Sequence, residues 1–197
     1  MIIIGLCGGS GAGKGTVADC FMKHGIPSVD TDAVYRELTT RGSSLLLELA
    51  DAFGSDILTE EGDLNRKRLA QVVFSDSEKH KLLNSITHKK ILQEAEVRFK
   101  RYADEGIPAA ICDAPLLFES GFYKKCDVII AVTAPTERRI ARLVKRDGIS
   151  EEAARQRISS QLSDEYLTEH SDHVIVNDGD VSQLQMQIDK LVNIILK

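Results

Sequence analysis

The chain has 197 residues, of which 43% are hydrophobic and 28% charged, and a formal net charge of −5. These proportions are typical of a soluble globular protein with one core domain that needs no disulfides for stability. The net negative charge argues against a nucleic-acid partner, because nucleic-acid-binding proteins usually carry a basic face. The five histidines and four cysteines show no zinc-ligand spacing. We therefore expect free thiols in a reducing compartment and no structural zinc site.

No stretch approaches the roughly 20 apolar residues that a transmembrane helix needs. The opening run MIIIGLCGGSG is too short for a signal peptide and lacks a basic flank. We therefore expect a cytoplasmic protein with no membrane partner, either a monomer or a weak homo-oligomer.

Short apolar runs alternate with helical segments along the chain. The first run is followed by a glycine-rich loop and by a segment from Lys14 to Lys23 whose apolar stripe predicts a helix capped by Gly25. The last segment, from Val181 to Ile195, repeats apolar residues every three or four positions and predicts an amphipathic helix. This alternation predicts an α/β doubly wound fold with a parallel five-stranded sheet flanked by helices. The predicted strands are Ile2–Cys7, Ile26–Val29, Ala109–Cys112, Val128–Val132 and His173–Val176.

Two long stretches interrupt the alternation of strands and helices. The first, between Asp32 and Pro108, has no convincing strand and is far longer than a usual βα connection. It predicts a helical insertion that provides a second binding surface. The second, roughly from Arg138 to His170, is highly charged and helical. We expect a single domain with a core at 1–32, 104–137 and 171–197, an insertion at 33–103 and a helical excursion at 138–170.

A phosphate-binding loop is the most specific motif in the sequence. Residues 8–14 read G-G-S-G-A-G-K and lie between the first apolar run and the first predicted helix. The glycines let the backbone N–H groups surround phosphates, and the helix adds the positive end of its dipole. Lys14 supplies a full positive charge to the β- and γ-phosphates. The motif predicts a P-loop NTPase fold that binds a nucleoside triphosphate through Gly11, Ala12, Gly13, Lys14, Gly15 and Thr16.

Gly15 departs from the usual form of this loop. Ser or Thr normally follows the lysine, and its hydroxyl ligates Mg²⁺, whereas here Thr16 comes one position later. Adenylate kinases share this G-K-G-T variant. We therefore expect Mg²⁺ to be held mainly by phosphate oxygens and water, with protein carboxylates such as Asp32 and Asp113 nearby.

Carboxylates follow two of the predicted strands. Asp30 and Asp32 follow the second strand, and in an extended segment this spacing puts both carboxylates on one side, facing the ligand crevice. One of them can then accept the proton of an acceptor hydroxyl, although Asp32 is equally suited to cap a helix that starts at Ala33. Asp113 ends the third strand, as in a Walker B motif, where it can orient a metal-bound water. A turn or capping role for Asp113 is the alternative.

An arginine-rich segment starts the second helical stretch. On a helix, Arg139, Arg142 and Arg146 share one face, whereas Ile140 and Val144 share another. Guanidinium groups bind phosphate oxygens well, and on a mobile element they can close over a transferring phosphoryl group. The alternative is a solvated face whose arginines pair with nearby acids such as Asp147, Glu151 and Glu152.

Taken together, these motifs resemble the dephospho-CoA kinase family over nearly the whole chain. The resemblance implies transfer of the γ-phosphoryl group of ATP to the ribose 3′-hydroxyl of dephospho-CoA, with Mg²⁺ as cofactor and no nucleic-acid partner. Its motifs are the phosphate loop, V-D-T-D (residues 29–32), L-x-R-x-x-L (64–69), L-x-x-I-x-H (83–88), D-A-P-L-L-F-E (113–119), R-L-x-x-R-D (142–147), Gln161 and D-x-V-I-x-N (172–177).

The family pattern also implies residue roles. Asp32 would be the catalytic base, Lys14 would neutralise charge, and Arg146 would clamp phosphate from a lid at 138–170. The insertion at 33–103 would bind dephospho-CoA. ATP contacts would come from Arg142, Asn177 and Gly179, and acceptor contacts from Asp30, His88, Asp113 and Leu116. His88 is equally suited to a packing role, and it precedes Lys89 where the family often has proline.

Two other functions compete with this interpretation. A nucleotide kinase is favoured by Gly15, although such enzymes do not usually carry D-A-P-L-L-F-E. A GTP-dependent switch would need the guanine-selecting sequence N-K-x-D, and Asn177 is followed instead by Asp-Gly-Asp.

Overall fold

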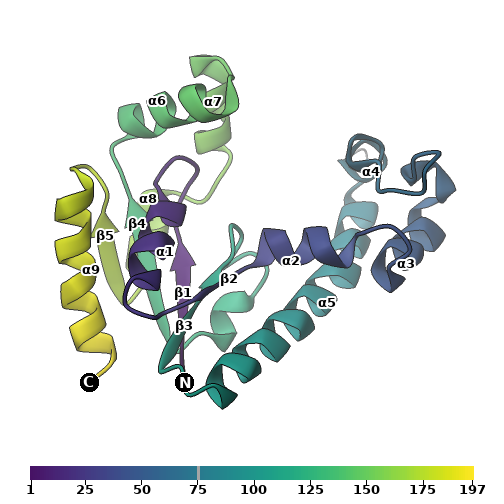
Figure 1. The fold of residues 1–197 in the computed structure, drawn as a ribbon. Helices are drawn as coiled ribbons and strands as arrows, with labels where there is room; N and C mark the ends of the chain where they lie inside the picture. The colour runs from purple at the N-terminus through teal and green to yellow at the C-terminus, as the bar shows by residue number, and fades with distance from the viewer. Residues whose placement is uncertain (75) are drawn as a thin grey trace. The chain divides into compact units, whose positions relative to one another are not determined.

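The computed structural model describes residues 1–74 and 76–197 (Figure 1). Within these residues, five strands form one parallel sheet in the spatial order β2-β3-β1-β4-β5. β1 lies at its centre, where Ile4 pairs with Ile111 on one side and Val128 on the other. This arrangement confirms the predicted α/β fold. The strands are β1 (Ile2–Cys7), β2 (Ser28–Asp30), β3 (Ala109–Asp113), β4 (Val128–Thr133) and β5 (His173–Val176).

Helices connect the strands, and several begin at a serine or aspartate whose side chain accepts a backbone hydrogen bond. Ser43, Ser150, Ser163 and Asp180 each cap a helix in this way. The helices are α1 (Lys14–Met22), α2 (Thr31–Leu38), α3 (Ser44–Phe53), α4 (Arg66–Phe74), α5 (Ser77–Asp104), α6 (Thr136–Asp147), α7 (Glu151–Ser159), α8 (Asp164–Glu169) and α9 (Val181–Ile195), with 3₁₀ helices η1 (Ser55–Ile57) and η2 (Phe122–Lys125).

The second strand differs most from its predicted bounds, because it starts two residues later than expected. The N–H of Ile26 bonds to Phe21 O and that of Gly25 to Met22 O, which together close the C-terminus of α1. Gly25 has φ +73°, a left-handed conformation that glycine adopts without steric cost, so its predicted capping role is confirmed. Ile26 therefore belongs to the C-terminal cap of α1 rather than to β2.

The two faces of the sheet are packed differently. Ile4 and Leu6 of β1 point to the face that α1 and α9 cover, and they lie in a core with Phe21 and Ile188. Gly5 points to the opposite face, where an added Cβ would lie 2.8 Å from Cys126 Sγ. The missing side chain therefore lets the segment after β3 approach the sheet closely.

The chain divides into two compact units, residues 1–29 with 99–197, and residues 30–98. The second unit is helical as predicted, and apart from Asp30 at the end of β2 its described residues outside the helices include one isolated bridge, between Leu58 and Leu64. It has its own apolar core, formed by Leu45, Leu49, Phe53, Ile57, Leu69 and Val73. None of the helices in the described part of the chain is long and apolar enough to span a membrane.

Candidate active site

The phosphate loop follows β1 and leads into α1. Gly11 and Gly13 have φ of +78° and +98°, values that residues with a Cβ rarely adopt. A Cβ on Gly13 would also collide with Asn177 Nδ2. Lys14 starts α1, and its Nζ donates a hydrogen bond to Gly8 O at 2.9 Å, which holds the ammonium group over the loop.

Arg139 fixes the loop to α6 and α8. Its side chain is only 4% exposed, Nε donates to Ser10 O at 2.9 Å, and Nη1 donates to both carboxylate oxygens of Asp164 at 2.9 and 3.0 Å. The guanidinium group also packs so closely on Gly9 that a Cβ there would collide with it. Helical spacing placed Arg139 on the basic face, but Arg139 was not among the predicted site residues.

Arg142 and Asn177 meet at the same loop, next to Arg139. Arg142 Nη1 donates to Gly11 O and Ala12 O at 3.1 and 3.2 Å, and Nη2 donates to Asn177 O at 3.1 Å. The buried Asn177 amide donates to Ala12 O at 2.8 Å. Two of the predicted ATP-binding residues are therefore brought together on the loop. Gly179 follows β5, where a Cβ would collide with the Gln183 side chain.

Gln161 is a further contact to the loop. Its Oε1 accepts a hydrogen bond from the Ser10 N–H at 2.7 Å, so the segment between α7 and α8 also touches the phosphate-binding backbone. Gln161 was visible in the sequence as part of a family motif, whereas nothing in the pattern marked Asp164. Thr16 is exposed on α1.

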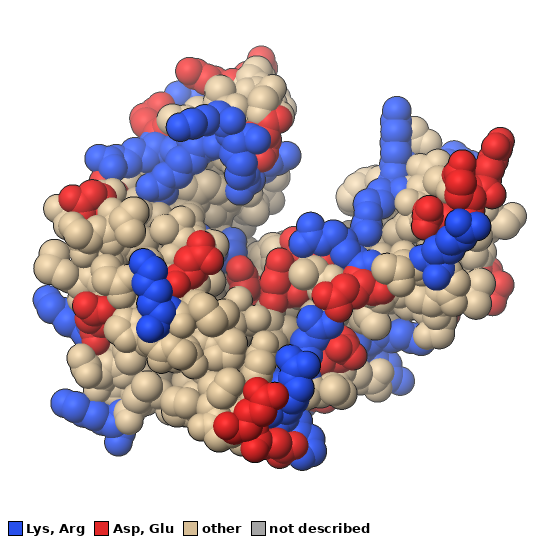
Figure 2. Space-filling view, in the orientation of Figure 1, with Lys and Arg blue, Asp and Glu red and all other residues tan. Residues whose placement is uncertain are grey.

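Arg146 lies on the same helix but has a different partner. Figure 2 shows Lys and Arg side chains gathered over α6. The Arg146 side chain is 66% exposed, and its Nε lies 2.7 Å from Asp147 Oδ1, while Arg157 Nη1 lies 2.6 Å from Asp147 Oδ2. Hydrogen bonds from Arg146 and Arg157 lower the pKa of Asp147 to about 2. Of the three arginines, Arg139 and Arg142 contact the phosphate loop. Arg146 instead pairs with an acidic side chain, as the alternative of a solvent-exposed helix face predicts.

The carboxylates after β2 are arranged differently from the prediction. Asp30 is the N-cap of α2, and its Oδ1 accepts hydrogen bonds from the N–H groups of Asp32 and Ala33 at 2.8 and 3.1 Å. The alternative in which Asp32 caps a helix starting at Ala33 is therefore wrong, as is the expectation that both carboxylates lie on one side of an extended segment. The reason is that the helix starts at Thr31, so Asp32 lies in its first turn.

The other predicted acceptor residues lie in separate elements. Asp113 ends β3 and is half-buried beside Leu6 of β1, while Leu116 is 48% exposed in the segment that follows. His88 lies in α5, within the second compact unit. Burial lowers the pKa of His88, and the nearby His80 lowers it further.

Comparison with known proteins places this site in a family. The dephospho-CoA kinase family matches residues 2–183. The chain belongs to the dephospho-CoA kinase family. The dephospho-CoA kinase of Corynebacterium glutamicum is 41% identical over 196 residues, which cover 100% of this chain and 98% of that protein.

Solved structures agree with the family assignment. A crystal structure of TT1252 from Thermus thermophilus has a TM-score of 0.83 and 30% identity, covering 98% of this chain and 96% of that one. A dephospho-CoA kinase from Campylobacter jejuni has a TM-score of 0.71 and 26% identity, covering 97% and 95%. The P-loop kinase fold and the family resemblance that the motifs carried are both confirmed.

Proposed function

We propose that this chain transfers the γ-phosphoryl group of ATP to the ribose 3′-hydroxyl of dephospho-CoA, forming CoA and ADP. The observation that carries the proposal is the match to the dephospho-CoA kinase family over residues 2–183. The phosphate loop supports it, because left-handed glycines precede α1 and Lys14 is the first residue of that helix. Both substrates are water-soluble, which fits the predicted cytoplasmic location.

Phosphoryl transfer depends on charge neutralisation and in-line placement more than on covalent help. In the proposed reaction, Lys14 exchanges the Gly8 carbonyl for the β- and γ-phosphates, and the loop N–H groups bind phosphate oxygens. Arg142, Asn177 and Gly179 form the proposed ATP side. Arg146 is the proposed clamp of a lid at 138–170, and to act it must exchange Asp147 for a phosphate oxygen.

Asp32 is the proposed base, which accepts the proton of the acceptor hydroxyl as its oxygen bonds to phosphorus. Asp32 lies in the first turn of α2 and is not the N-cap of that helix. Asp30 is less suited to the role of base, since one of its oxygens already accepts two backbone hydrogen bonds. The insertion at 33–103 is proposed to recognise the acceptor, with contacts from Asp30, His88, Asp113 and Leu116.

Magnesium fits this chain as a partner of the nucleotide rather than as a resident ion. No group of three or more His, Cys, Asp or Glu side chains in the described part of the chain is arranged to hold a metal. Space is open around Gly15, where other loops place a ligating hydroxyl. We propose that Mg²⁺ binds on the phosphates, where it would neutralise their charge, with Asp113 and Asp32 orienting its waters.

A coupled ADP-release assay tests the proposed activity. The assay compares dephospho-CoA with AMP, CMP and shikimate as acceptors, and we expect turnover to depend on dephospho-CoA. A Lys14→Met variant is the control for contaminating kinases, because it loses the charge on the phosphates. Turnover that occurs equally without dephospho-CoA, or only with another acceptor, would contradict the proposal.

The role of Asp32 has its own test. Asp32→Asn is expected to lower kcat by about 10²-fold or more, with little change in ATP affinity, because only proton acceptance is lost. Asp51→Asn, on α3 of the same unit, is the matched control. A near-wild-type kcat for Asp32→Asn would mean that another group accepts the proton.

A further inference from the structure

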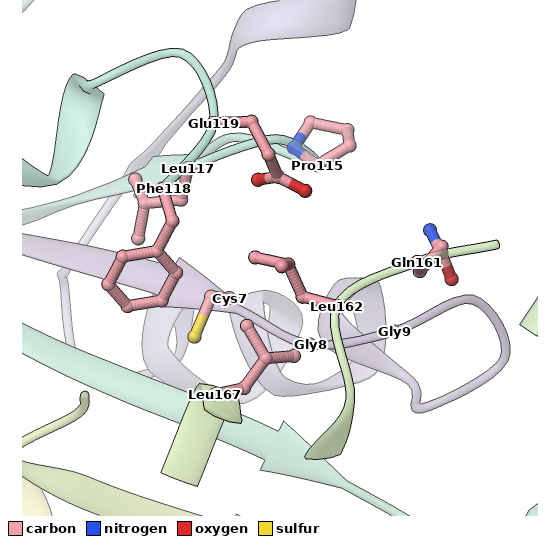
Figure 3. A pocket seen from close by; sticks show the side chains of 10 residues that line it. All are labelled: Cys7, Gly8, Gly9, Pro115, Leu117, Phe118, Glu119, Gln161, Leu162 and Leu167. Carbon is pink, nitrogen blue, oxygen red and sulfur yellow. The ribbon is translucent and has the colours of Figure 1, made fainter. Parts of the chain in front are cut away.

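A small open pocket lies beside the start of the phosphate loop, within the first compact unit (Figure 3). Gly8 and Gly9 form the wall that belongs to the loop. The segment after β3 contributes a second wall, and the segment leading into α8 a third. The lining side chains in these walls are Cys7, Pro115, Leu117, Phe118, Glu119, Gln161, Leu162 and Leu167.

The lining of the pocket is mostly apolar, with one carboxylate. Leu162 and Leu167 present aliphatic surfaces, and the Glu119 carboxylate points into the space between them and Pro115 (Figure 3). Among the described residues, none donates a hydrogen bond to the Glu119 carboxylate or forms an ion pair with it. Glu119 is exposed, so its carboxylate is available to a ligand.

The pocket is close to the group that would hold the transferred phosphate. Burial raises the pKa of the Cys7 thiol, and the charge of Lys14 lowers it while that of Glu119 raises it. Lys14 and Glu119 are therefore both within electrostatic range of the same sulfur atom. A ligand in the pocket would lie between the phosphate-binding loop and a carboxylate.

The sheet order shows on which side of β1 the Glu119 wall lies. β3 and β5 lie on opposite sides of β1, and Asn177 at the end of β5 contacts the loop from one side. The segment that carries Glu119 follows β3, on the other side. Since the β5 side is the proposed ATP side, the wall that carries Glu119 lies on the side left for the acceptor, whereas the wall from Gln161 to Leu167 belongs to the segment that leads into β5.

We infer that the sugar of the acceptor lies against the open mouth of this pocket, and that Glu119 accepts a hydrogen bond from the hydroxyl next to the one that is phosphorylated. This inference rests on the proposed function, in which that neighbouring group is the ribose 2′-hydroxyl. A carboxylate repels phosphate but accepts hydrogen bonds strongly from hydroxyl groups. The leucine side chains suit the C–H surface of a sugar ring, so the lining selects a neutral polyol rather than a second anion.

The assignment makes Glu119 a specificity-determining residue. A site built to bond a substrate hydroxyl discriminates against an analogue that lacks it, because a polar group is then left unpaired. We expect the wild-type enzyme to use 2′-deoxy-dephospho-CoA about 10- to 100-fold less well than dephospho-CoA, measured as kcat/KM. The solvent exposure of Glu119 keeps the difference at this modest size.

The test compares two substrates in the wild-type enzyme and three variants. In Glu119→Ala, kcat/KM for dephospho-CoA is expected to fall about 10- to 100-fold, whereas that for the 2′-deoxy analogue hardly changes, so the discrimination disappears. Glu119→Gln keeps a neutral acceptor oxygen and is expected to retain part of the discrimination. Glu169→Gln, an exposed substitution at the end of α8, is the matched control and is expected to discriminate like the wild type.

Two outcomes would overturn the inference. In the first, Glu119→Ala discriminates between the two sugars as the wild type does, or the wild type does not discriminate at all. In the second, Glu119→Ala loses the same large factor of kcat on both substrates, which would mean that Glu119 accepts the reacting proton. Failure of the proposed function looks different, because wild-type enzyme would then not turn over dephospho-CoA. An unchanged ADP affinity in each variant verifies that the fold is intact.

Discussion

Replacement of Arg139 by methionine tests how the phosphate loop is held. The substitution keeps a long apolar stem but removes three hydrogen bonds, one to Ser10 O and two to the Asp164 carboxylate. Because the arginine side chain is 4% exposed, neither water nor another side chain readily replaces it. The loop backbone at Ser10 and α8 at Asp164 would both lose their common partner.

The expected loss of stability follows from the burial of the pair. Removing one partner of a buried ion pair costs about 3–5 kcal/mol, because the other charge remains without compensation. The Asp164 side chain is 30% exposed, so water solvates part of it and the expected cost falls to about 2–3 kcal/mol. For a chain of this size, that corresponds to a decrease in Tm of about 5–10 °C.

Thermal denaturation with and without MgATP measures both consequences. We expect Arg139→Met to lower Tm and also to reduce the stabilisation by MgATP, because a loosened loop binds phosphates less well. Arg138→Met is the matched control, since it removes the same charge from an exposed position on the same helix. Equal losses in the two variants would refute the idea that Arg139 fixes the loop. Arg139→Lys is expected to give an intermediate loss, because one ammonium group cannot replace the guanidinium fork.

Three further predictions concern the loop and the arginine helix. Gly13→Ala is expected to abolish tight ATP binding, because the new Cβ collides with Asn177 and the backbone at this position is left-handed. Gly15→Ala is expected to bind ATP normally, because the space around Gly15 is open. Equal ATP affinities of the two variants, measured by calorimetry, would contradict this prediction. Gly15→Ser is expected to lower the Mg²⁺ concentration needed for half-maximal rate, and an unchanged metal dependence would show that Mg²⁺ does not lie near this position. Arg146→Ala is expected to raise the pKa of Asp147 from about 2 toward its usual value of 3.8, as measured by carboxyl NMR titration. Because that pKa is lowered in the folded state, the stabilisation by the pair is complete above about 3.8 and is lost as the pH falls through about 2. A midpoint that does not move in the variant would mean that the pairing does not form in solution.

The fold was predictable because the sequence patterns of the strands, the helices and their caps are consistent with one another. Apolar β-branched runs gave the bounds of β1 and β5, and Gly25 predicted the end of α1. The error at β2 arose because Ile26 is apolar, like a strand residue, but its N–H group closes the preceding helix. Apolar character alone does not distinguish these two uses of a residue.

The candidate site was only partly predictable, because side-chain direction depends on tertiary contacts. Helical spacing placed three arginines on one face but could not tell which of them contact the loop. Arg139 and Arg142 do so because the N-terminal part of α6 packs on the loop, whereas Arg146 lies one turn farther and pairs with Asp147. Likewise, V-D-T-D indicated two carboxylates at the end of a strand, and only Asp32 was considered as the residue that caps the following helix. In the structure, Asp30 caps that helix instead.

The central claim is that the acceptor is the ribose 3′-hydroxyl of dephospho-CoA, and phosphorus NMR of the reaction product tests it most directly. Purified enzyme is incubated with MgATP and dephospho-CoA, and the product is compared with authentic CoA and with its 2′-phosphate isomer. The account predicts one new phosphomonoester signal that matches CoA, formed in equal amount with ADP and absent with Lys14→Met. ADP formation without a new phosphomonoester, or a phosphate at the 2′-position, would contradict it.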